Sequence, residues 1–242
     1  MYASVLTKTV RDRWRGVTIG TVSLAALLYL GMMAYQDIDL SIYTDLGPAF
    51  QSLIGIGEDA DAASLAYNAI YSTYGAIILA GIALAMGSAF IAGEERKGTI
   101  GVLLGNPRSR TQVTVAKAGA MLLLIAAAGL ALWAAGVATP AALDVSVQGM
   151  DVAAFTLHLI VSTLFYGFLA LAVGAWTGRT GLAAGISSGV LMLSFLGVGI
   201  LQAIEGAQDW ARIFPWYYFS GSDPLLNGIS WGHLAVLAGA SS

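Results

Sequence analysis

The sequence has no cysteine and very few charged residues, and these two absences exclude several classes of protein. Without cysteine the chain has no disulfide, no thiolate metal ligand and no cysteine-linked lipid. Only 10% of its residues are charged and 57% are hydrophobic, whereas soluble domains carry about a quarter charged residues. The composition therefore indicates an integral membrane protein with no room for a sizeable soluble domain.

Long runs without charge divide the chain into membrane spans. A span needs roughly 20 apolar residues, and the first five runs reach that length. The first is interpreted as a retained span, because no convincing small-residue cleavage site follows it. We therefore predict an all-α six-transmembrane-helix bundle forming one domain over 1–242, with spans at 17–35, 71–92, 117–138, 154–176, 181–204 and 231–242. The sixth run is too short to cross a bilayer, so we expect the natural chain to continue.

Three segments outside the spans have distinctive compositions. Residues 1–15 carry four basic residues and an apolar face at helical spacing, which fits an amphipathic helix on the membrane surface or an ordinary basic flank. Residues 205–230 are rich in aromatic rings and broken by glycine and proline, which indicates an external re-entrant segment. Residues 93–116 are polar and mostly basic.

The basic residues indicate the orientation of the chain. Ten of the eleven fall before the first span, between the second and third, or between the fourth and fifth. Only Arg212 lies on the other side, together with eleven of the fourteen acids. By the positive-inside rule, the N-terminus and residues 93–116 are predicted to be cytoplasmic. We further expect a multi-pass protein of the plasma membrane, from a prokaryote.

Apart from Lys117 at the start of the third, the first five predicted spans contain no Asp, Glu, Lys or Arg, which argues against ion-coupled transport. His158 is the one histidine within them. It could act as a proton relay, or it could be a hydrogen-bonded packing residue. His158, Tyr166 and Phe195 are candidate residues of a substrate path, although the aromatic ones could equally face lipid. Small residues at Ala170/Gly174 and Gly185/Gly189 favour close helix packing, within one subunit or in a dimer.

The chain lacks a nucleotide-binding motif of its own. Gly93 to Thr99 has the outer glycine spacing of a phosphate loop, but Lys97 precedes the second glycine instead of following it. Zinc-ligand spacings and a nucleophile elbow are also absent from the sequence. We therefore predict that the chain is not an enzyme and binds no cofactor or metal itself.

The segment after the second span carries a resemblance to a known family. A glutamate-rich turn, Glu94-Glu95-Arg96-Lys97, is followed by Gly98-Thr99-Ile100, a leucine pair, Pro107-Arg108-Ser109-Arg110, and Lys117. This order resembles the membrane subunit of type-2 ABC exporters, the ABC-2 permease family. The match covers about 25 residues, and the six-span plan and the aromatic segment extend it. Asn106 before the proline and the short sixth span depart from the family's pattern.

The resemblance implies a permease subunit of an ATP-driven exporter whose coupling helix docks on a separate ATPase. Gly98 and Thr99 can open such a helix and Asn106-Pro107 can end it. The residues implied in coupling are Glu94, Glu95, Arg96, Lys97, Gly98, Thr99, Pro107, Arg108 and Arg110. The expected partners are ABC ATPase subunits that carry ATP and Mg²⁺, a second permease half or a homodimer, and membrane lipid, with no nucleic acid. The alternative is an ATP-independent transporter or a structural membrane anchor.

Overall fold

The computed structural model describes residues 2–36, 62–96 and 109–240, and it excludes the side chains of residues 2–4, 62, 95, 96 and 110. Every regular element in these ranges is helical, which confirms the predicted all-α class. The coupling helix expected between Gly98 and Asn106 lies outside the described residues, as do Lys97, Pro107 and Arg108.

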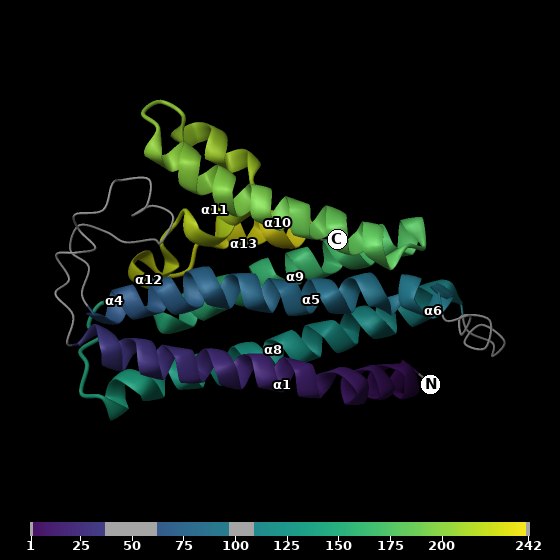
Figure 1. Ribbon diagram of the computed structural model, residues 1–242, viewed down its shortest axis with the longest axis horizontal. Helices are drawn as coiled ribbons and strands as arrows, with labels where there is room; N and C mark the ends of the chain where they lie inside the picture. The colour runs from purple at the N-terminus through teal and green to yellow at the C-terminus, as the bar shows by residue number, and fades with distance from the viewer. Residues whose placement is uncertain (1, 37–61, 97–108, 241–242) are drawn as a thin grey trace.

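Long helices run side by side and alternate in direction (Figure 1). Helices α4, η1 and α5 follow one another without a break and form one such rod. Within the described ranges, five helical stretches are long and apolar enough to cross a membrane. The elements that form them are α1 (Tyr2–Tyr35), α4 (Ala62–Ala66) with η1 (Tyr67–Gly75) and α5 (Ala76–Phe90), α8 (Arg110–Ala142), α9 (Val152–Thr177) and α10 (Thr180–Ala203).

The first helix corrects one expectation. Residues 2–35 form a single helix, so the basic N-terminal segment does not make a separate helix on the membrane surface. Lys8 and Arg15 instead lie on the same rod as the apolar residues of the first span. No proline or other break interrupts this sequence, and helix propagation is favourable once a helix has started. The ordinary basic flank is the interpretation that the structure supports.

Helices α5 and α9 approach closely where both carry small residues. A Cβ atom placed on Gly87 would lie 2.1 Å from the carbonyl oxygen of Gly167 and 3.2 Å from the Cβ of Ala170. Farther along, Gly174 packs beside Ser88 and Ala183. The predicted Ala170/Gly174 pair therefore packs within the subunit, because only small residues let two helix backbones come this close. Gly185 and Gly189, by contrast, face open space.

The second long rod contains a stretch of π-helix, η1, which is uncommon at nine residues. Two buried tyrosines on this stretch bond to the backbone of α8. The Tyr67 hydroxyl donates to the Gly136 carbonyl at 2.6 Å, and the Tyr71 hydroxyl donates to the Leu132 carbonyl at 3.0 Å. The two donor tyrosines are four residues apart, and so are the two acceptor residues. One face of η1 therefore meets one face of α8.

The residues after α10 fold back onto the bundle as short helices (Figure 1). They are η2 (Gln208–Ile213), α11 (Pro215–Ser220), α12 (Pro224–Asn227) and α13 (Trp231–Gly239). Trp216 and Phe219 on α11 are buried and pack edge to face, with ring centroids 5.3 Å apart. Trp216 also packs on Phe195 of α10. Part of the aromatic segment is therefore core, while Trp210 in the segment and Trp231 just after it are exposed.

A single hydrogen bond fixes the start of α11 to α10. The Trp216 backbone N–H donates to the Ser194 hydroxyl at 2.7 Å, and both residues are buried. Replacing Ser194 with alanine leaves this N–H without a partner, which costs about 1–3 kcal/mol. We expect Ser194→Ala to lower the thermal unfolding midpoint of the purified protein in detergent.

The matched control for this prediction is Ser187→Ala on the same helix. The Ser187 hydroxyl is also buried, but it has no hydrogen-bond partner among the described residues. Its removal should leave the midpoint unchanged or slightly higher, because it deletes an unsatisfied buried polar group. Equal losses from both serines would contradict the role assigned to the Ser194 bond.

Candidate coupling site at the junction of α5, α6 and α8

The site lies where two long helices end and begin at the same end of the bundle. Helix α5 ends at Phe90, and the chain bends at Ile91 into the short helix α6 (Ala92–Arg96). Helix α8 begins at Arg110 with a capping box, in which the Ser109 hydroxyl accepts from the Gln112 N–H and the Gln112 side chain accepts from the Ser109 N–H. This box fixes the entry of the chain into α8.

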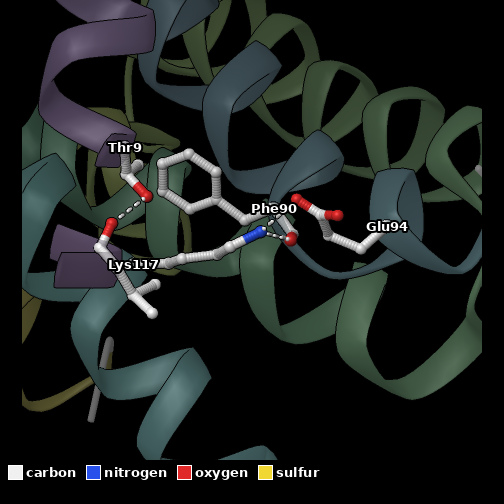
Figure 2. A network of polar contacts seen from close by, with 5 residues as sticks. Thr9, Phe90, Glu94 and Lys117 are labelled. Carbon is white, nitrogen blue, oxygen red and sulfur yellow. Dashed lines mark hydrogen bonds and ion pairs between the residues drawn. The ribbon is translucent and has the colours of Figure 1, made fainter. Parts of the chain in front are cut away.

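Lys117 connects the two helices from the inside of the bundle (Figure 2). It lies two turns into α8, and its side chain is only 7% exposed. Its Nζ donates to the Phe90 carbonyl and to Glu94 Oε1, the latter at 3.0 Å. The Phe90 carbonyl is among the last of α5, which have no partner within the helix. Lys117 therefore supplies a donor to the end of α5 and a counter-charge to α6.

The surroundings of this ion pair are partly apolar. The Phe90 ring lies 5.8 Å from Lys117 Nζ, and Thr9 of α1 lies beside it (Figure 2). Glu94 is more accessible, with 29% of its side chain exposed. A buried ammonium loses hydration, and only well-placed partners offset that loss. The pair thus depends on α5, α6 and α8 keeping their relative positions.

The basic residues gather at the same end of the bundle. The N-terminal half of α1, which carries the basic flank, lies at the end where α6 is found (Figure 1). The turn between α9 and α10, which contains Arg179, is at that end as well. The acidic residues Asp144, Glu205 and Asp209 follow the opposite ends of α8 and α10. Among the described residues, these basic and acidic positions therefore lie toward opposite ends of the bundle.

Only part of the predicted coupling set is described by the structure. Glu94 is at the site and pairs with Lys117. Glu95 and Arg96 belong to α6 and Arg110 opens α8, but their side chains are outside the described part. Lys97, Gly98, Thr99, Pro107 and Arg108 lie outside it entirely.

Sequence reasoning left Lys117 out of the candidate coupling residues. Its partner Glu94 is 23 residues away, and no local pattern joins them. A signal was nonetheless present, because a lysine two turns inside an apolar helix needs a counter-charge. The Ser109-x-x-Gln112 capping box also marked the true start of this helix, seven residues before Lys117.

The candidate substrate-path residues lie in the packed interior. His158 and Tyr166 of α9 are fully buried, and Phe195 of α10 is partly buried. His158 Nδ1 donates to the Ala154 carbonyl at 2.9 Å, while its Nε2 has no partner among the described residues. The carbonyl can only accept, so Nδ1 is the donor in this bond. His158 is therefore a buried packing residue with a hydrogen bond at only one of its two ring nitrogens.

The fold and this junction define a class of protein, an α-helical multi-pass membrane protein with a buried ion pair where α5, α6 and α8 meet. The family comparison then names the group. The family model described as ABC-2 family transporter protein matches residues 3–211. The chain therefore belongs to the ABC-2 family of transporter membrane proteins, a permease type that has no ATPase of its own. No curated protein and no solved structure matches it.

Proposed function

We propose that the chain is the membrane permease of an ATP-driven exporter and that the segment beginning at α6 receives the motion of a separate ATPase. ABC-2 family membrane proteins generally work with ABC ATPases. In this proposal the ATPase holds ATP and Mg²⁺, the basic end of the bundle faces the cytoplasm of a prokaryotic cell, and a second permease half or a second copy completes the path.

The observation that carries the proposal is the contact of Lys117 with both Phe90 and Glu94. Residues 97–108 separate α6 from α8 in the chain, and Lys117 on α8 contacts Glu94 on α6 and Phe90 at the end of α5. A force applied to the connection reaches α5 through Glu94 and the Phe90 carbonyl, and it reaches α8 directly. Glu95, Arg96, Arg108 and Arg110 supply the charged contacts to the ATPase surface.

The proposal also indicates the chemical class of the substrate. The exported molecule is amphipathic or hydrophobic, because the predicted spans that would line its path carry no acidic or basic residue except Lys117 at the start of the third. His158, Tyr166 and Phe195 are the residues proposed along this path. Ion-coupled transport has no support from the sequence, because such transport usually requires ionisable residues within the spans.

The experiment is affinity purification of the chain from its native membranes in a mild detergent. A protein with a phosphate loop should co-purify, and the complex should hydrolyse ATP. Glu95→Gln should lower ATP turnover of the complex about tenfold, as expected when a charged contact of about 1.5–3 kcal/mol is lost at the interface.

The matched control is Glu205→Gln, which makes the same change at an exposed position near the opposite end of the bundle. It should leave both association and ATP turnover unchanged. The proposal fails if no ATPase co-purifies. It also fails if Glu95→Gln and Glu205→Gln give the same turnover as the unmodified chain.

A further inference from the structure

A cavity of about 410 Å³ lies beside the Lys117–Glu94 pair. Its walls come from α1, α5, α6 and α8, so three of the membrane-spanning rods meet around it. Its lining residues are Thr9, Asp12, Arg13, Ala89, Phe90, Gly93, Glu94 and Lys117. Most of the side chains that line it are polar or charged, which distinguishes it from an apolar packing defect.

The cavity lies at the level where the hydrocarbon part of the bundle ends. The last charged residue of α1 is Arg15, and the helix carries no further charge through Tyr35. Exposed Trp14 stands next to the cavity wall in sequence, and tryptophan prefers the headgroup level of a bilayer. Ile19 and Val22, which follow on α1, are 67% and 61% exposed and would face acyl chains. A molecule in this cavity therefore sits at the membrane interface.

Charged side chains of both signs line the cavity, and only some of them have hydrogen-bond or ion-pair partners among the described residues. Lys117 is engaged by Glu94 and the Phe90 carbonyl. Arg13 is half-buried and Asp12 is exposed, and neither forms a hydrogen bond or ion pair with the part of the chain that the structure describes. The Thr9 hydroxyl donates to the Val5 carbonyl at 2.8 Å, which leaves its oxygen free to accept. The cavity thus offers a guanidinium donor, a carboxylate and a hydroxyl acceptor.

We propose that this cavity binds the headgroup of a zwitterionic phospholipid, with the phosphate on Arg13 and a primary ammonium on Asp12. A guanidinium matches the oxygens of a phosphate, and a carboxylate accepts from an ammonium. A purely anionic headgroup would face Asp12 and Glu94, whereas a lone cation would face Arg13 and Lys117. The acyl chains run along Ile19, which lies seven residues after Asp12 and so on the same face of α1. This site goes beyond the proposed coupling function and does not depend on an ATPase.

The test is a competition read by native mass spectrometry of the full chain released from detergent. Equal amounts of phosphatidylethanolamine and phosphatidylglycerol with the same acyl chains are added, and retained adducts are counted. Phosphatidylethanolamine should be retained about fivefold more. Arg13→Gln should weaken its binding about tenfold, the loss expected for one charge-assisted contact. Asp12→Asn should abolish the preference between the two lipids.

The matched control is Arg15→Gln, because Arg15 belongs to the same helix and loses the same charge but does not line the cavity. It should change lipid retention less than twofold. Equal losses from Arg13→Gln and Arg15→Gln would overturn the site in favour of general surface charge. The proposal is also overturned if phosphatidylglycerol binds equally well, or if inorganic phosphate displaces the lipid at similar concentration. If Arg13→Gln does not fold, the exposed variant Asp12→Asn provides the test. The proposal is rejected if Asp12→Asn still prefers phosphatidylethanolamine over phosphatidylglycerol.

Discussion

Lys117→Met is expected to separate the coupling segment from the spans and to destabilise the protein by about 2–3 kcal/mol. Breaking a buried ion pair by removing one partner costs about 3–5 kcal/mol, and the partial exposure of Glu94 reduces that figure. The variant leaves the Phe90 carbonyl and Glu94 without the donor that now bonds to both. Methionine keeps the apolar length of the lysine stem, so the change chiefly removes the charge and the hydrogen bonds.

The measurement combines thermal unfolding in detergent with ATP turnover of the complex with its ATPase. Glu94→Gln keeps the shape of the acceptor and should cost less stability, about 1 kcal/mol, because the lysine retains the Phe90 carbonyl. If the junction transmits motion, Glu94→Gln should still lower ATP turnover severalfold at a temperature where the protein is fully folded. The matched control is Lys8→Met, which removes a basic residue from the exposed face of α1. Unchanged stability and turnover in Lys117→Met would reject the junction as a coupling element.

Gly87→Ala should be the most damaging single methyl addition among the glycines of α5. The added Cβ would stand 2.1 Å from the Gly167 carbonyl oxygen and 2.9 Å from the Leu171 backbone nitrogen. Both atoms belong to the backbone of α9, so no side chain can rotate away and the two helices must separate. Overpacking of this kind costs about 3 kcal/mol or more.

Gly81→Ala on the same helix is the matched control for Gly87→Ala, because a Cβ there meets nothing within 4 Å. Alanine at Gly81 should be neutral or stabilising by up to about 1 kcal/mol, since glycine is the poorer helix former. Thermal unfolding midpoints and the yield of monodisperse protein in detergent compare the two variants. Similar values for both would show that α5 and α9 do not pack through Gly87.

Much of the architecture could be predicted from composition and charge alone. Uncharged runs of about span length must form helices in a bilayer, because hydrocarbon offers no partner for backbone N–H and C=O groups. Among the described residues, the basic flank of α1 lies at one end of the bundle, and Asp144, Glu205 and Asp209 follow helix ends at the other. The resemblance carried by Glu94 to Lys117 agrees with the family match over residues 3–211.

Contacts between residues far apart in the chain required the tertiary structure. Periodicity did not distinguish Gly87, which meets the backbone of α9, from Gly81, which faces open space, because both are glycines in one apolar helix. The fold also decided that Trp216 is core and Trp210 is exposed, although the two lie in one aromatic stretch.

The sequence by itself determined a helical membrane protein with its basic residues at one end and a family motif after the second span. Hydrophobicity and charge act residue by residue, so they can be read along the chain. The pairing of Lys117 with Glu94 and the mixed-charge cavity beside Arg13 were decided by the tertiary structure alone. Each depends on how separate helices are placed against one another, and that placement is set by packing across the whole bundle.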